Sequence, residues 1–284
     1  MAVAEALGLP PVDKLPLAGG RPLAELVDIL VHGRLPRVAE LDPYTLGTTV
    51  SRYGNAKTYQ QRDEYVPRTK DEPLAAALRP GRLVVLVGPS KVGKTRTAVE
   101  VLRGHGAWGG ALLAAPVSGS LDYLAGHPAL SGSDPLVIWL DDLLRFLPPA
   151  GALSQATISK LLDRPGPAVL LATLRTEQRE RLWAAGGQLT QNVRLVLDNA
   201  SSIELRSTMA DVGERARVAA VYPDVSSLPG GLAEILAGAP ELLRRYRDAA
   251  TADPPLHTLI QVGVDWARCG LARPIPEPDL LALA

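Results

Sequence analysis

The stretch LVVLVGPSKVGKT at residues 83–95 joins an apolar, β-branched run to the pattern Gly88-x-x-x-x-Gly93-Lys94-Thr95. The residues that follow, RTAVEVLR, favour a helix, so the pattern lies between a predicted strand and a predicted helix. A polyphosphate is held best by backbone N–H groups, and Gly88 and Gly93 let the chain bend around it without side-chain clashes. The following helix adds its positive N-terminal end. The stretch therefore predicts a phosphate-binding loop.

The side chains of this loop suit a bound nucleotide. Lys94 can neutralise the β- and γ-phosphates, and Thr95 can offer its hydroxyl to Mg²⁺. The loop residues expected to contact the nucleotide are Gly88, Pro89, Ser90, Lys91, Val92, Gly93, Lys94, Thr95 and Arg96. A chance glycine-proline turn carrying Gly-Lys-Thr is the alternative, but it does not explain the flanking strand and helix. We therefore expect a nucleoside triphosphate and Mg²⁺ as ligands.

A pair of acids, Asp141 and Asp142, follows the apolar run LVIWL at residues 136–140. A buried strand that ends in an acid presents a carboxylate to the ligand crevice of a parallel sheet. Asp141 is the predicted Mg²⁺ residue, acting through a water, and Asp142 is the predicted catalytic residue that orients or deprotonates the attacking water. A strand that merely stops at a polar turn is the alternative, and the phosphate loop about fifty residues earlier argues against it.

The run AVLLATLR at residues 168–175 indicates a further strand with a polar end. A polar or cationic side chain at the end of a neighbouring strand can sense a γ-phosphate. Thr173 and Arg175 are both candidates, and arginine is better suited to bind an anion through two hydrogen bonds. Arg175 therefore joins Lys94 and Asp142 as a predicted catalytic residue, with a surface arginine at a strand end as the alternative.

The alternation of strands and helices from residue 65 onward sets the fold class. Strands are predicted at 83–87, 111–117, 136–140, 168–173 and 202–206. Helices are predicted at 73–79, 95–103, 119–126, 152–163, 176–186 and 188–198, then at 208–220, 230–237, 240–249 and 255–268. Residues 21–32 (RPLAELVDILVH) predict an amphipathic helix, and 43–62 predict a loop or linker. The predicted fold is α/β, a three-layer α/β/α core with a five-stranded parallel sheet followed by an all-helical lid.

Composition excludes several classes of protein. Lys and Arg together number 30, as do Asp and Glu, so overall charge does not favour nucleic acid or an anionic membrane as a partner. The single cysteine, Cys269, excludes an intramolecular disulfide, and the four histidines show no metal-ligand spacing. No stretch approaches the roughly 18–20 apolar residues of a membrane span, and no signal peptide is evident. We expect a cytoplasmic protein.

These motifs, in this order, resemble the STAND class of P-loop ATPases, the signal-transduction branch related to AAA+ proteins. The segment Tyr65-Val66-Pro67-Arg68 resembles one that precedes the P-loop and contacts the nucleotide, with Pro67 where the class has glycine. Gly238-Ala-Pro240 resembles the Gly-x-Pro motif of the helical subdomain, whose proline approaches the base. The resemblance implies that ATP or ADP binds, and it adds Tyr65, Val66, Arg68 and Pro240 to the expected nucleotide contacts.

The same resemblance implies a division of the chain. Residues 1–62 would form an N-terminal helical and linker segment, 63–207 the P-loop NTPase core, 208–252 the helical lid, and 253–284 the beginning of a winged-helix-like segment that we expect to continue beyond this sequence. The pattern is similar to the NTPase module of large actinobacterial tetratricopeptide-repeat proteins. We expect protein partners or self-association through a region beyond residue 284.

The function implied is a regulatory switch that binds ATP and hydrolyses it slowly. One alternative is a nucleic-acid-associated AAA-like ATPase whose C-terminal helices contact DNA through Arg244, Arg245 and Arg247. A small-molecule P-loop phosphotransferase is another, and would use the lid to exclude water. A scaffold that binds nucleotide without hydrolysing it is the third.

Overall fold

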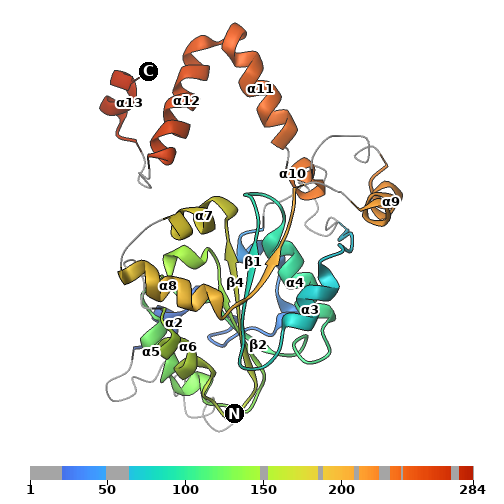
Figure 1. Ribbon diagram of the computed structural model, residues 1–284, viewed down its shortest axis with the longest axis vertical. Helices are drawn as coiled ribbons and strands as arrows, with labels where there is room; N and C mark the ends of the chain where they lie inside the picture. Colours follow the sequence, from blue (N-terminus) through green and yellow to red (C-terminus); the bar gives the residue numbers. More distant parts are fainter. Residues whose placement is uncertain are drawn as a thin grey trace.

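The computed structural model describes residues 21–48, 64–147, 153–184, 188–207, 211–223, 231–237, 239–269 and 275–283. Within these ranges a five-stranded parallel sheet has the order β2-β3-β4-β1-β5 (Figure 1). The strands are β1 (Leu83–Val87), β2 (Leu112–Ala114), β3 (Leu136–Leu140), β4 (Ala168–Leu174) and β5 (Ser201–Glu204). This arrangement confirms the predicted α/β fold class and the predicted five-stranded parallel sheet.

The three central strands form because their sequences are continuous apolar runs. Every residue of β1, β3 and β4 is buried, as expected for parallel strands that are covered on both faces. β4 pairs with β1 on one side and with β3 on the other, and Leu86 is in register with Thr173. Because all strands point the same way, the segments that follow β1, β3 and β4 lie together at the carboxyl ends of the strands.

Helices cover both faces of the sheet. The helices of the core are α3 (Asp71–Ala77), α4 (Lys94–Gly104), α5 (Leu121–Ala125), α6 (Gln155–Leu162), α7 (Thr176–Ala184) and α8 (Gln188–Asp198), with short 3₁₀ turns η4 (Pro128–Leu130) and η5 (Leu143–Arg145). Val84 and Leu86 pack in one buried cluster with Leu102 of α4. Val85 packs in a second cluster with Ile158 of α6. Successive side chains of β1 therefore face opposite sides of the sheet and pack in different clusters, so the sheet is the middle of three layers.

The N-terminal part differs from the prediction. A helix forms only at α2 (Leu23–Leu26), and Val27 is already extended, so the predicted helix over 21–32 is wrong beyond its first turn. The chain instead bonds the outer edge of the sheet at two places, with antiparallel bridges from Val27 to Pro116 and from Arg37 to Leu112, and a turn closed by Val31 and Arg34 lies between them. Backbone groups in this part of the chain bond the sheet edge and are not available to a helix, which explains the difference.

Two short 3₁₀ turns then bring the chain onto the core. They are η2 (Val38–Glu40) and η3 (Pro43–Leu46). Leu41 and Leu46 are buried in the same cluster as α4, so residues 43–46 form an ordered turn, which agrees with the predicted loop and not with a weakly ordered linker. Residues 49–62 of the predicted linker lie outside the described ranges.

Four of the remaining helices follow the predicted order, and the last, α13 (Glu277–Leu283), was not predicted. The four are α9 (Val212–Val221), α10 (Leu232–Leu236), α11 (Ala239–Ala252) and α12 (Pro254–Arg268). Val218 of α9 and Ile235 of α10 bury against Val66, forming a small core of their own. In Figure 1, α11 and α12 form a helical pair that extends away from the sheet, and the rings of Tyr246 and His257 stack between them at 4.4 Å. No helix among the described residues has the length and apolarity needed to cross a membrane.

Candidate nucleotide-binding site

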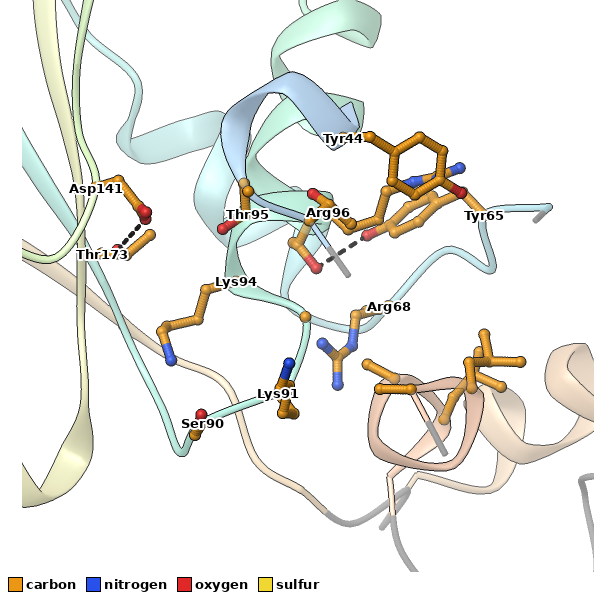
Figure 2. A pocket seen from close by; sticks show the side chains of 18 of the residues that line it. Tyr44, Tyr65, Arg68, Ser90, Lys91, Lys94, Thr95, Arg96, Asp141 and Thr173 are labelled. Carbon is orange, nitrogen blue, oxygen red and sulfur yellow. Dashed lines mark hydrogen bonds between the residues drawn. The ribbon is translucent and has the colours of Figure 1, made fainter. Parts of the chain in front are cut away.

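A cavity of about 290 Å³ lies where the ends of β1, β3 and β4 meet α10 (Figure 2). Most of the residues predicted from the sequence line it: Tyr65, Val66, Arg68, Ser90, Lys91, Gly93, Lys94, Thr95, Arg96, Asp141, Asp142 and Arg175. These residues come from segments that are far apart in the chain, and the fold brings them around one space. That space lies at the position where an α/β sheet binds its ligand.

The loop after β1 has the bend that its glycines were expected to allow. Gly93, which precedes α4, has φ 93°, a left-handed conformation that disfavours a side chain. At Gly88 a Cβ atom would lie 2.7 Å from the carbonyl oxygen of Leu205 and 2.9 Å from the Cγ1 atom of Val92. Gly88, Pro89 and Val92 do not line the cavity, so they shape the loop and do not form its wall.

The ammonium group of Lys94 lies within the loop. It donates hydrogen bonds to the carbonyl oxygens of Gly88 (2.8 Å) and Pro89 (2.7 Å). Burial, and then the nearby positive charge of Arg175, lower the pKa of Lys94 below its ordinary value. A negatively charged ligand in the cavity would favour the protonated form again. The site is therefore electrostatically suited to an anion.

A threonine connects the two acids that follow β3. The hydroxyl of Thr173 donates to Oδ1 of Asp141 (2.9 Å) and accepts from the backbone N–H of Asp142 (2.9 Å). Asp142 has φ 56°, an uncommon left-handed conformation for a residue other than glycine. Its Oδ1 atom is buried and has no hydrogen-bond partner among the described residues. A buried carboxylate oxygen without a donor is a candidate to bind a water or a ligand group.

The donor set fits Mg²⁺. Thr95 and Asp141 both line the cavity, and Figure 2 shows their oxygen atoms on the part of the cavity close to Lys94. A hydroxyl and a carboxylate are the hard oxygen ligands that Mg²⁺ prefers, and it takes the rest of its shell from phosphates and water. Among the described residues no group of three or more His, Cys, Asp or Glu side chains forms a metal cluster of protein ligands alone.

Of the two residues predicted to sense the γ-phosphate, Thr173 is buried and Arg175 is exposed. Arg175 lines the cavity, and its charge acts on Lys94. Its backbone N–H donates to Oε1 of Gln178 (3.0 Å) at the start of α7. Thr173, in contrast, bonds directly to Asp141, so it is the candidate that is tied to the predicted metal residue.

The segment before α3 links the loop after β1 to α9 through the side chain of Arg68. The guanidinium of Arg68 donates to the carbonyl oxygen of Val92 (2.8 Å) and forms an ion pair with Glu214 of α9 (3.4 Å). Both side chains are largely buried, at 14% and 11% exposure. The hydroxyl of Tyr65 donates to Oδ1 of Asp71 (2.8 Å), and burial followed by the Asp71 charge raises the pKa of Tyr65. Tyr65 is therefore a neutral hydrogen-bonding group.

The lid side of the cavity is formed by α10 and the residue that follows it. Leu232, Ala233, Leu236 and Ala237 line the cavity, and a Cβ atom on Gly93 would lie 3.0 Å from the Cβ of Ala233. α10, in the region predicted to be a lid, therefore packs directly on the loop after β1. Pro240 lies in the first turn of α11, and its side chain is outside the described side chains, so its contact with a base stays a prediction.

Sequence reasoning missed one wall of the cavity. Tyr44, Gly47 and Thr48, from η3 and the residues after it, line the same space. A Cβ atom on Gly47 would lie 3.9 Å from Oδ2 of Asp141. The Asp42-Pro43 pair indicates a turn, since the Asp42 carboxylate caps the backbone N–H of Tyr44 at 3.1 Å. No local signal shows where that turn packs.

The strand order, the glycine-rich loop after β1 and the paired acids after β3 define a P-loop NTPase-like α/β core. No model of a known protein family matches the sequence, and no curated protein matches it. Among solved structures, the chain is similar to that of C. elegans PCH-2, with 14% sequence identity and a TM-score of 0.31 over 72% of this chain and 60% of that one. This similarity is too small to support a fold or a function. The fold assignment rests on the strand order and the loop after β1 of this chain.

Proposed function

We propose that this protein is a regulatory switch that binds Mg²⁺-ATP or ADP and hydrolyses ATP slowly, in the manner of STAND-type ATPases. One observation carries the proposal: the cavity is shared between the P-loop and the lid. Ala233 packs on Gly93, and Arg68 bonds both the P-loop carbonyl of Val92 and Glu214 of α9. A ligand in this cavity contacts both parts, so its phosphates can set the position of the lid.

The residues divide the work of such a site. The loop N–H groups and Lys94 bind the phosphates, which draws the lysine ammonium from the carbonyl oxygens of Gly88 and Pro89 toward the anion. Thr95 and Asp141 would hold Mg²⁺, which neutralises phosphate oxygens when it is bound. Asp142, with its unpartnered Oδ1 atom, orients the attacking water and accepts its proton.

Slow turnover follows from what the site contains. Asp142 is shorter than glutamate and reaches less far toward a water. Arg175 is exposed, so its position is set weakly compared with that of the buried Thr173. Without a fixed arginine on the γ-phosphate, transition-state charge is stabilised less, an effect that is worth about 10³-fold or more in related chemistry. Such a site favours a long-lived ATP state, as a switch requires.

The first test is calorimetric binding of ATP, ADP and GTP with Mg²⁺ to the wild-type protein and to Lys94→Ala. We expect adenine-selective binding that the variant loses. Lys160→Ala is a matched control, because Lys160 lies on α6 and does not line the cavity. Equal binding by wild type and Lys94→Ala would contradict the proposal.

Steady-state phosphate release separates a switch from other ATP-dependent functions. We expect less than about one turnover per second, below the 1–100 per second typical of kinases. Turnover of many per second, or phosphate transfer to a small molecule, would favour a motor or a phosphotransferase. Turnover that rises with DNA, together with salt-sensitive DNA binding, would favour the nucleic-acid-associated alternative.

A further inference from the structure

We propose that the N-terminal turn, residues 42–48, is a wall of the nucleotide site in which Tyr44 contacts the nucleoside and Thr48 contacts the phosphate end. This inference rests on the proposed function and extends it to a segment that no motif marks. The turn is anchored in the core beside the cavity. Leu46 is 5% exposed and packs in the buried cluster that contains α4.

The turn is held in shape by its own hydrogen bonds. The Asp42 carboxylate accepts from the backbone N–H of Tyr44 (3.1 Å), and the N–H groups of Gly47 and Thr48 bond back to Tyr44 (3.1 Å) and Pro43 (3.3 Å). Gly47 has φ 84°, a left-handed end that suits glycine. The turn is therefore preorganised, and a ligand that contacts it does not have to order it first.

One end of the turn lies at the predicted phosphate and metal residues. A Cβ atom on Gly47 would be 3.9 Å from Oδ2 of Asp141, so the backbone there lies against the acid. The neighbouring hydroxyl of Thr48 lines the cavity, is buried, and has no hydrogen-bond partner among the described residues. A buried hydroxyl without a partner is costly, and a phosphate oxygen or a water on the metal would satisfy it.

The other end of the turn lies toward the nucleoside. Tyr44 and Arg96 line the same cavity, and Figure 2 shows the Tyr44 ring on the side where Tyr65 and Arg96 lie. Figure 2 shows Asp141, the predicted Mg²⁺ residue, on the opposite side of the cavity from Tyr44. Because Mg²⁺ binds the β- and γ-phosphates, a nucleotide in the loop would extend its sugar and base away from Asp141 and toward Tyr44. An aromatic ring at that place contacts a sugar or base through its face or edge.

The test uses two ligands, Mg²⁺-ATP and Mg²⁺-tripolyphosphate, which lacks the nucleoside. We expect Tyr44→Ala to weaken ATP binding about tenfold and to leave tripolyphosphate binding unchanged, since one base–aromatic contact has this scale. We expect Thr48→Val to weaken both ligands about tenfold while the unliganded protein unfolds at the same or a higher temperature, because an unsatisfied buried hydroxyl is removed. Tyr123→Ala is the control, since Tyr123 is 52% exposed on α5 and outside the cavity.

The outcomes separate this inference from the function on which it rests. Failure of the wild-type protein to bind ATP would overturn both. ATP binding that depends on Lys94 but is unchanged in Tyr44→Ala and Thr48→Val would overturn only the role of the turn. Loss of both ligands by Tyr44→Ala, with a lowered unfolding temperature, would assign Tyr44 to holding the fold and would also overturn the inference.

Discussion

The two sides of the candidate site are held in different ways. On the core side, the P-loop follows a fully buried strand in the middle of the sheet. The space around Gly88 is filled, because a Cβ atom there would clash with the carbonyl oxygen of Leu205 and the side chain of Val92. On the lid side, α9 and α10 share a cluster of only three buried apolar residues among the described part of the chain, supported by the Arg68–Glu214 pair. A nucleotide bound between them would contact a firmly held part and a weakly held one, so we expect α9 and α10 to be the part whose position changes.

The largest effect is expected on the core side. Gly88→Ala places a Cβ atom 2.7 Å from the carbonyl oxygen of Leu205, so we expect the free energy of unfolding to fall. The expected loss is about 2 kcal/mol, within the range for overpacking. Chemical denaturation measures it.

Gly104→Ala is the matched control for that substitution. A Cβ atom there meets nothing within 4 Å, and Gly104 ends α4. We expect a gain of about 0.5 kcal/mol from reduced freedom of the unfolded chain. Equal losses at the two glycines would show that close packing of the P-loop is not what holds the core side.

The next effect concerns the link between the two acids. Thr173→Val removes the hydroxyl that donates to Asp141 and accepts from the N–H of Asp142. We expect unfolding free energy to fall by about 1–2 kcal/mol, because buried groups lose their partner. ATP hydrolysis should fall about tenfold as the carboxylates lose their fixed orientation. Thr173→Ser keeps the hydroxyl and should retain most of both, and a serine variant as poor as valine would assign the effect to packing.

A smaller effect is expected on the lid side. Glu214→Gln removes the charge that pairs with Arg68 at 3.4 Å. We expect local stability of α9 to fall by about 1 kcal/mol, seen as faster amide hydrogen exchange in α9 and unchanged exchange in β1. Asp265→Asn is the control, because the side chains of Asp265 and its partner Arg268 are 58% and 75% exposed, and an exposed ion pair contributes little. Faster exchange in the sheet as well would mean that the lid and the core unfold together.

The smallest effect is a pH dependence of binding. The pKa of Lys94 is lowered from 10.5, mainly by burial, so the lysine loses its charge at a lower pH than an exposed one. ATP affinity should therefore fall as pH rises through that lowered pKa, at a lower pH than for an exposed lysine. Calorimetry on wild type and on Lys94→Arg measures this fall. The arginine stays charged, so its affinity should change less, and parallel curves would contradict the assignment to Lys94.

The sequence was sufficient for those parts of the fold that depend on short-range patterns. The bounds of β1 and β3 match the prediction to the residue, because a parallel strand covered on both faces is a continuous apolar run. The bend of the loop after β1 was predictable for a similar reason, since the φ of 93° at Gly93 strongly favours glycine. Such requirements are local and appear directly in the residue types.

The parts that were missed depend on contacts between distant residues. Residues 21–32 have the apolar spacing of a helix, yet the helix ends at Leu26 and Asp28 bonds Ala115 at the edge of the sheet. Tyr44 lines the cavity only because Leu46 anchors its turn in the core, and no spacing in the sequence indicates that. Thr173 and Arg175 were both candidates from the sequence, and only the register of β4 with its neighbours shows that Thr173 is the one that bonds Asp141. Tertiary packing decided each of these.

The segment 28–38, which bonds the outer edge of the sheet beside β2, is expected to hinder pairing of this edge with a second chain. An open sheet edge offers unpaired backbone groups to a second chain, and natural proteins cover such edges. Here Asp28 donates its N–H to Ala115 and Leu113 donates to Pro36, so several outward backbone groups at this edge already have partners. A shortened protein that begins after residue 38 would keep the whole phosphate loop and both acids, but it would expose this edge. We expect such a protein to aggregate through β2, because the backbone groups that residues 28–38 occupy would be open to a second chain.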